Sequence, residues 1–316
     1  MHGGGFDYLV FASAKSGTTW TQSLLNAHPT VVCAESRAFG DYFDPTNLSG
    51  PHLTVEKFIA FLGAYYRAPV PASEKGAFNK RLLHRVLGAI ADESRASSGK
   101  PIYGEKLTPY VGTALGAVRA MHEWNPAVRF VHLVRDGRDV VVSAAAHNLN
   151  NRAKYAPGGP DSAQAKEASA FLASSTLPDE MVRRYAAMWA DASSAAFEAQ
   201  RLFPNFLEIR YEEMWERPRE HARAIFEFIG ADASEAVVDR CVQASSFEAA
   251  SGGRKPGEED RGAFVRKGSP GDWSNWFTPE QLRVFQSIAG EQMALRGYTS
   301  GEPVVRVVSR TRREPA

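Results

Sequence analysis

Short apolar runs alternate with longer amphipathic segments along this chain, and the alternation predicts its strands and helices. The first run, Phe6–Phe11, is continuously apolar, which is typical of a strand buried on both faces of a parallel sheet. Further strands are predicted at 30–34, 102–106, 130–134 and 206–210. Apolar residues at helical spacing predict helices at 54–67, 78–96, 111–124, 178–201, 219–229, 234–244 and 279–296. The alternation favours an α/β fold.

The first predicted strand ends in a turn of small and hydroxylated residues that runs directly into a helix. The first N–H groups of a helix lack partners within it, and the helix dipole adds positive charge there. Gly17 lets the backbone approach an anion, Lys15 adds a full charge, and Thr18 and Thr19 add hydroxyl donors. The turn therefore predicts an anion site. It is not a Walker A loop, because Lys15 precedes the glycine by two residues. An ordinary turn with its lysine in solvent is the alternative.

A second basic motif follows the predicted strand 130–134, which delivers Arg135 to its carboxyl end. A turn then starts a helix in which Ser143 lies about two turns from the beginning. Arg135 and Ser143 can therefore converge on one anion, and the planar arginine fork suits phosphate oxygens. We expect a helix-capping network from the other charged residues of this motif, which are Asp136, Arg138 and Asp139.

A third motif, Phe264–Thr278, follows a polar loop at 252–262. It contains two adjacent cations, Arg266 and Lys267, and then Gly268. The formal net charge of the chain is only +1, so this local cluster is a candidate phosphate clamp. A solvated pair of surface charges is the alternative.

These three motifs resemble the cofactor-binding elements of sulfotransferases that use 3′-phosphoadenosine 5′-phosphosulfate (PAPS). K-S-G-T-T-W is similar to the family's 5′-phosphosulfate loop, R-D-G-R-D-V-x-x-S to its 3′-phosphate element, and R-K-G-x-x-G-D-W-x-x-x-F-T to its C-terminal signature. The resemblance covers about residues 6–297. It implies the P-loop-NTPase-like sulfotransferase fold, a single α/β domain at 1–299 with a central parallel sheet and helices on both faces. Residues 150–177 are expected to form a lid or insertion, and 300–316 a frayed tail.

The resemblance implies sulfuryl transfer from PAPS to a hydroxyl or amine of a small-molecule, lipid or glycan acceptor, leaving adenosine 3′,5′-bisphosphate (PAP). Lys15 would neutralise the leaving 5′-phosphate within the loop Ser16, Gly17, Thr18 and Thr19, and Lys106 would hold the transferring group. The residues implied at the 3′-phosphate are Arg135, Ser143, Arg266, Lys267 and Gly268. Those implied around adenine are Trp20, Tyr211, Ser245 and Phe247. Packing in the core is the alternative for Tyr211, and a solvated surface position for Lys106.

The general base is assigned from a departure from the family pattern. Soluble relatives that sulfate phenols and steroids carry a histidine in K-T-H-x-P, but this chain has Lys106-Leu107-Thr108-Pro109. Other branches use a glutamate after the second strand, and Glu35 is similar to that position. An ordinary glutamate is a weak base at neutral pH, so burial would have to raise its pKa. The alternative for Glu35 is a surface salt bridge with Arg37; Glu105 and His147 are fallback bases.

Composition restricts the partners and the location. A net charge near zero gives little reason to expect nucleic acid. Two cysteines do not suggest a disulfide framework and fit a reducing cytoplasm. We see no signal peptide, and no apolar run reaches the ~20 residues of a membrane span. The alanine- and arginine-rich composition indicates the bacterial branch of the family. No metal site is expected, and the oligomeric state is not readable.

Two other functions stay open at this point. A P-loop kinase would need its lysine after the glycine and an acidic residue at the end of strand 130–134, where this chain has Arg135. A non-catalytic nucleotide binder would keep the cleft without transfer. The presence of both Lys15 and Lys106 argues against it.

Overall fold

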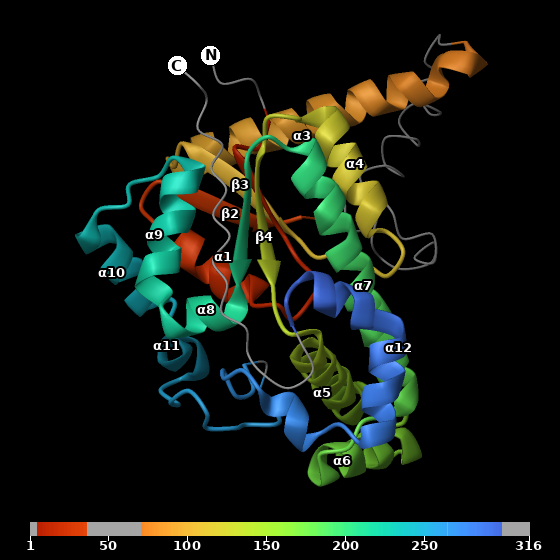
Figure 1. The fold of residues 1–316 in the computed structure, drawn as a ribbon. Coiled ribbons are helices and arrows are strands. Elements are labelled where there is room, and N and C mark those ends of the chain that lie inside the picture. Colours follow the sequence, from red (N-terminus) through yellow and green to blue (C-terminus); the bar gives the residue numbers. More distant parts are fainter. Residues whose placement is uncertain (1–4, 37–70, 264, 299–316) are drawn as a thin grey trace.

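Five parallel strands form the central sheet of the computed structural model, in the order β2-β3-β1-β4-β5 (Figure 1). The structure describes residues 5–36, 71–263 and 265–298. The strands are β1 (Tyr8–Phe11), β2 (Val31–Glu35), β3 (Ile102–Leu107), β4 (Arg129–Val134) and β5 (Phe206–Arg210). All five predicted strands are confirmed, with small shifts of their ends; β1 begins two residues later than the apolar run does.

Helices cover both faces of the sheet, as predicted. Alternate residues of β1 point to opposite faces, so Leu9 and Phe11 lie in one core and Tyr8 and Val10 in another. The first face is covered by α3 (Lys75–Ser98), α4 (Ala114–Trp124) and α7 (Asp179–Leu202). The second is covered by α1 (Thr18–Asn26), α9 (Pro218–Ile229) and α10 (Glu235–Ala244). The fold is therefore a three-layer α/β arrangement.

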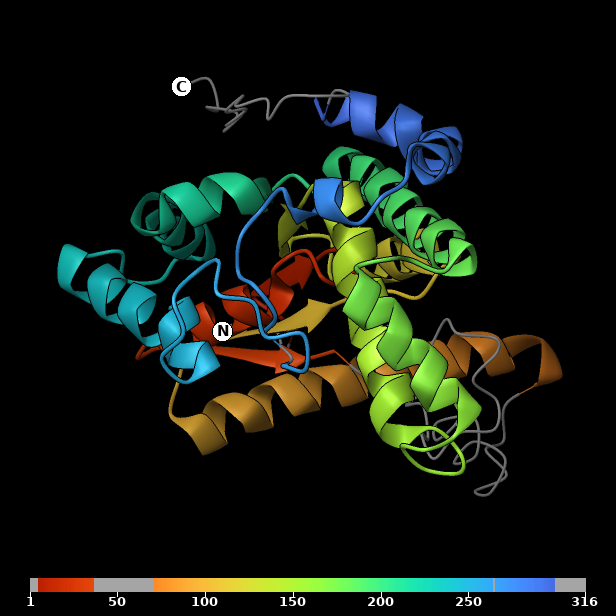
Figure 2. The same cartoon turned by 90° about the horizontal axis from the view of Figure 1, so that it is seen from below.

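A third apolar core lies beyond the carboxyl ends of the strands. It contains buried residues of α5 (Gly137–Tyr155), α6 (Ala163–Ser174), α7 and α12 (Pro279–Leu295). Thr278 caps α12 by accepting from the Gln281 N–H, while Gln281 bonds back to the Thr278 backbone. This core supports α5, the helix that follows β4. Figure 2 views the molecule from the carboxyl edge of the sheet.

The segment 150–177, predicted as a lid or insertion, is largely helical. Its first residues continue α5 to Tyr155, and α6 occupies 163–174. Ala168 and Leu172 of α6 are buried in the third core. A lid motion of this segment stays a prediction. The predicted helix 54–67 and the predicted tail 300–316 lie outside the described residues, as do residues 37–53.

The remaining short elements lie near the carboxyl edge or at the start of α3. They are η1 (Ala72–Glu74), α8 (Tyr211–Glu216), α11 (Phe247–Ser251) and η2 (Asp272–Asn275). Cys33 and Cys241 are both buried free thiols. In the described part of the chain, none of the helices combines the length and apolarity that a membrane crossing requires.

The sheet order places the first turn at a change of direction. β1 pairs with β3 on one side and with β4 on the other, so the chain crosses over β1 between these strands. In open α/β sheets, ligands bind at the carboxyl ends of the strands at such a switch point. The turn after β1, and the residues that end β3 and β4, therefore meet in one place.

Candidate active site

The turn after β1 has the backbone geometry of an anion loop. Lys15 and Gly17 both have left-handed φ angles, 69° and 92°, and α1 begins at Thr18. A Cβ atom on Gly17 would lie 2.7 Å from Cδ2 of Tyr211, so the position requires glycine. Among the described residues no side chain caps α1, and the buried hydroxyl of Ser16 has no hydrogen-bond partner. These donors fit an external anion.

Two lysines and a carboxylate meet beside this loop. Lys106 is only 6% exposed, and its Nζ lies 2.6 Å from Oε2 of Glu35, its partner in the β2–β3 register. Burial, with the nearby Lys106 charge, lowers the pKa of the Lys15 amine to about 8. An anion at this place would therefore be favoured by both cations. Lys106 is not the solvated surface lysine of the alternative.

The Glu35 carboxylate is more open than a buried base should be, since 39% of its side chain is exposed. The ion pair with Lys106 holds the Glu35 side chain at the carboxyl edge of β2 and β3. The alternative partner, Arg37, lies outside the described residues. Glu35 as general base therefore stays a prediction.

Glu105 has the environment that a raised pKa requires. It is 5% exposed, and the Tyr103 hydroxyl donates to its Oε1 at 2.9 Å. Burial raises the pKa of Glu105 to about 7, although hydrogen bonding to Ser36 and Tyr103 opposes the rise. Because successive strand residues alternate between faces, Glu105 points to the opposite face of β3 from Lys106. Its carboxyl can hold a proton near neutral pH without facing the two lysines.

This environment predicts that Glu105 shapes the pH dependence of stability. The folded carboxyl stays protonated up to about pH 7, whereas the unfolded one ionises near its ordinary value of 4.5. The Glu105 contribution to the free energy of unfolding should therefore fall as pH rises through that window, by up to roughly 3 kcal/mol. In urea unfolding from pH 4.5 to 8, Glu105→Gln should gain stability relative to the wild type as pH rises. Parallel curves would contradict the assignment.

Arg135 connects the second motif to the first. It is 9% exposed, and its Nη1 donates to the Lys15 carbonyl oxygen at 3.2 Å. Its guanidinium carbon lies 4.3 Å from the centre of the Tyr211 ring. Its Nε is buried and has no hydrogen-bond partner among the described residues. A buried cation with an unused donor fits an anionic ligand.

Tyr211 packs between the first motif, at Gly17, and the second motif, at Arg135. Its ring packs on Gly17 and under Arg135, and it meets Trp20 edge-on with ring centres 5.9 Å apart. It is the first residue of α8, which directly follows β5. The predicted contact of Trp20 and Tyr211 with adenine stays a prediction.

One face of α5 points toward the first turn. Asp139, Ser143 and His147 are four residues apart, so they share that face. Asp139 Oδ2 lies 3.6 Å from Nη2 of Arg135. Burial and the nearby Lys15 charge lower the pKa of His147. Ser143, which is half-buried, therefore lies between a residue beside Arg135 and one near Lys15.

The third motif packs on the Phe247 turn. A Cβ atom on Gly268 would collide with the Phe247 ring, and the Trp215 indole donates to the Gly268 carbonyl at 2.7 Å. The Ser245 hydroxyl is buried and donates to the Cys241 carbonyl at 2.8 Å. Gly268 and Phe247 are thus in contact, and the Ser245 hydroxyl bonds to the backbone at the end of α10. Nucleotide contact by these residues stays a prediction.

Carboxylates hold the two cations of this motif. Arg266 Nη2 and Lys267 Nζ lie 2.6 and 2.5 Å from the two oxygens of Asp272, and Arg266 also pairs with Glu259. Burial opposes ionisation of Asp272, but hydrogen bonds from Lys267, Asn275 and Arg266 hold its pKa below the ordinary value. The cations are therefore partly buried and held in ion pairs, and they are not a solvated surface pair.

The acidic residues that pair with Arg266 and Lys267 were not predicted from the sequence. Asp272 lies within the third motif itself, and the only signal was its position a few residues after two basic ones.

Other polar contacts fix the start of α5 and the neighbouring strands. Glu212 Oε1 accepts from the Asp136 N–H at 2.9 Å, and the Tyr298 hydroxyl donates to the other oxygen of Glu212 at 2.8 Å. The expected capping network is present only in part: Asp136 accepts from the Arg138 N–H, whereas Asp139 accepts from the backbone of Gly271 and Trp273. His132 Nδ1 lies 3.0 Å from Oε2 of Glu208 inside the protein, away from Arg266 and Lys267.

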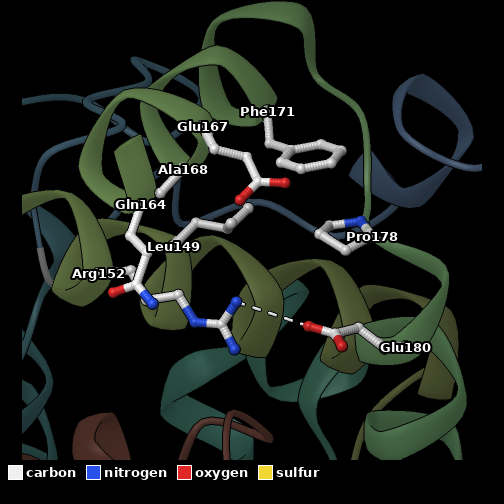
Figure 3. Close-up of a pocket in the computed structure, with 8 residues that line it drawn as sticks. All are labelled: Leu149, Arg152, Gln164, Glu167, Ala168, Phe171, Pro178 and Glu180. Carbon is white, nitrogen blue, oxygen red and sulfur yellow. Dashed lines mark ion pairs between the residues drawn. The ribbon is translucent and has the colours of Figure 1, made fainter. Parts of the chain in front are cut away.

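A cavity of about 520 Å³ opens between α5, α6 and the start of α7 (Figure 3). Arg152 Nη1 and Glu180 Oε1 lie 3.5 Å apart in it. Leu149, which lines it, is about 200° around α5 from His147. The cavity therefore lies outside the cluster of cations. Its other lining residues are Gln164, Glu167, Ala168, Phe171 and Pro178.

A search against protein families matches residues 6–297 to the model described as "Sulfotransferase domain". Among curated proteins, Sulfotransferase 1B1 of Mus musculus is 27% identical over 180 residues, covering 54% of this chain and 56% of that protein. Sulfotransferase 2B1 of Mus musculus is 30% identical over 174 residues, covering 52% of this chain and 48% of that protein. The chain thus spans about half the length of the curated relatives that it matches.

Among solved structures, mouse sulfotransferase SULT7A1 complexed with PAP matches with a TM-score of 0.53 and 19% sequence identity. The match covers 93% of this chain and 88% of that chain. At this identity the likeness establishes the fold, and the fold predicted from the motif resemblance is the one observed.

Proposed function

Because the chain belongs to the sulfotransferase domain family, we propose that it transfers the sulfuryl group of PAPS to a hydroxyl or amine of a small-molecule, lipid or glycan acceptor. The observation that carries the proposal is a continuous set of contacts between its three basic motifs. The Lys15 carbonyl accepts from Arg135, and Arg135 lies beside Asp139. Asp139 in turn accepts from the backbone of the loop that carries Arg266 and Lys267.

The residues of this site suit the two phosphate groups of such a cofactor. The first turn of α1, with Ser16, Lys15 and Lys106, offers donors and charge for the phosphosulfate. Arg135, which donates to the Lys15 carbonyl, has a buried Nε without a partner among the described residues. With Ser143, Arg266, Lys267 and Gly268, Arg135 would hold the 3′-phosphate.

Catalysis would depend on positioning and on charge. PAPS would supply an activated sulfuryl group, and an in-line displacement places the developing negative charge on its 5′-phosphate oxygen. Lys15 would neutralise that oxygen, since its pKa of about 8 leaves the amine mainly protonated at pH 7. Lys106, held by Glu35, would contact the sulfuryl oxygens. Glu35 would accept the acceptor's proton, with Glu105 and His147 as the weaker candidates.

We assign the acceptor pocket to three segments, 36–53, 150–177 and 252–262. Segments that connect the strands and helices of a scaffold commonly determine its specificity. A cytoplasmic location is proposed with it, since the two cysteines are free and buried, which suits a reducing compartment.

The test is an assay of PAP release. The purified chain is incubated with PAPS and a panel of phenols, steroids, amines, lipids and glycans, and PAP and the sulfated product are quantified by mass spectrometry. Acceptor-dependent release of PAP supports the proposal. Tight PAP binding without transfer to any acceptor would favour the non-catalytic binder, and phosphate transfer from ATP with Mg²⁺ would favour the kinase.

A further inference from the structure

The proposed 3′-phosphate site must be assembled from two segments that are far apart in the sequence. Arg135 lies in the turn between β4 and α5, and Ser143 in the second turn of α5, whereas Arg266 and Lys267 belong to the loop before η2. More than one hundred residues separate them, so a specific contact has to dock the loop on the helix. The structure shows that contact at the carboxylate of Asp139.

Asp139 binds the loop through its backbone. Its Oδ2 accepts from the Gly271 N–H at 2.7 Å, and its Oδ1 accepts from the Trp273 N–H at 3.0 Å. The side chain is 2% exposed, so both bonds are shielded from water. Asp136 already caps α5, and the Asp139 carboxylate is therefore not needed for the helix N-terminus.

The turn of the loop makes this arrangement possible. Gly271 has a left-handed φ of 85°, and the 3₁₀ turn η2 follows at once. The N–H groups on either side of Asp272 face Asp139, while the Asp272 side chain turns back to Arg266 and Lys267. One turn thus joins α5 through its backbone and the two cations through its side chain.

A second contact fixes the same turn. The guanidinium carbon of Arg138 lies 3.8 Å from the centre of the Trp273 ring, a close cation–π contact. Asp139 Oδ2, which accepts from Gly271, also lies 3.6 Å from Nη2 of Arg135, so one carboxylate interacts with both halves of the proposed site.

We propose that Asp139 is the positioning residue that docks the Arg266–Lys267 loop onto α5, so that Arg135, Ser143 and these two cations face one 3′-phosphate. The inference rests on the proposed function, because it assumes a nucleotide with a 3′-phosphate. It assigns Asp139 no contact with that nucleotide. Discrimination between nucleotides with and without a 3′-phosphate should therefore depend on Asp139.

The test compares PAP with adenosine 5′-monophosphate (AMP) by calorimetric titration of the wild type and Asp139→Asn. The asparagine keeps one acceptor oxygen but presents an NH₂ group to a backbone N–H. We expect roughly tenfold or greater loss of PAP affinity, equivalent to one hydrogen bond to a charged group. AMP affinity should change less than about threefold, since it lacks the phosphate that the loop serves.

Glu208→Gln is the matched control. Glu208 is a carboxylate in a buried ion pair with Arg296 and His132, away from the loop. Its replacement should lower the melting temperature but leave the ratio of PAP to AMP affinity unchanged. A merely structural Asp139 would behave in the same way, and that result would overturn the inference. No PAP preference in the wild type would instead overturn the proposed function.

A second variant covers the case in which Asp139→Asn does not fold. Trp273→Leu removes the contact with Arg138 and leaves every charge in place. The docking contact predicts the same selective loss of PAP affinity, and an unchanged ratio in this folded variant would overturn the inference.

Discussion

Replacing Lys15 with methionine should lower the rate of sulfuryl transfer by about 10²–10³, the loss typical of removing one transition-state charge stabiliser. Methionine keeps the apolar stem, and it is no more strained than lysine in the left-handed conformation at position 15. Only the charge at the leaving 5′-phosphate is therefore lost. The Lys15 amine is largely buried and lies near Lys106, and these surroundings lower its pKa to about 8. The interaction of the Lys15 charge with the leaving phosphate should therefore be strong.

Single-turnover rates with saturating PAPS measure this effect apart from binding. Lys80→Met is the control, because the Lys80 side chain is 48% exposed on α3 and pairs with Glu123 near the end of α4, outside the proposed site, and should leave the rate unchanged. Lys15→Arg should retain more activity than Lys15→Met, since it keeps a cation. A Lys15→Met enzyme with more than a third of the wild-type rate would remove Lys15 from the mechanism.

Glu35→Gln should keep PAP affinity within about threefold and lose roughly 10²–10⁴ in turnover, the range supplied by a general base. Glutamine can still accept from Lys106, so the cation should stay in place while the proton acceptor is lost. Isothermal titration with PAP and steady-state turnover, measured on the same preparation, separate the two effects.

Glu105→Gln provides the matched comparison, because Glu105 is on the neighbouring rung of the same two strands but on the other face. If Glu35 is the base, this variant should change stability more than turnover. Full activity of Glu35→Gln with a large loss in Glu105→Gln would transfer the role to Glu105, whose pKa of about 7 suits a base.

Local features of the fold and site were predictable because their causes are local. The turn after β1 needs glycine at position 17 and carries its lysine two residues earlier, and both facts are visible in the sequence. Arg135 ends an apolar strand, so its place at the carboxyl edge follows from the strand alone. Strands and most helices followed from periodicity for the same reason.

The less predictable features depend on contacts between distant segments. The first turns of α5 are buried among α6, α7 and η2, whereas its last residues, up to Tyr155, are mostly exposed and polar, so no single apolar periodicity marks the whole helix. The ion pairs of Asp272 and the position of Tyr211 between Gly17 and Arg135 also arise only on folding. No local spacing of residues encodes them.

The most direct test of the central claim is calorimetric titration of the wild type and Arg135→Ala with PAP, AMP and ATP with Mg²⁺. Arg135 links the first two motifs and has an unused buried donor, so it should determine recognition of the 3′-phosphate. We predict that the wild type binds PAP at least about tenfold more tightly than AMP, and that Arg135→Ala abolishes this preference. Equal or tighter binding of ATP with Mg²⁺ by the wild type would contradict the account.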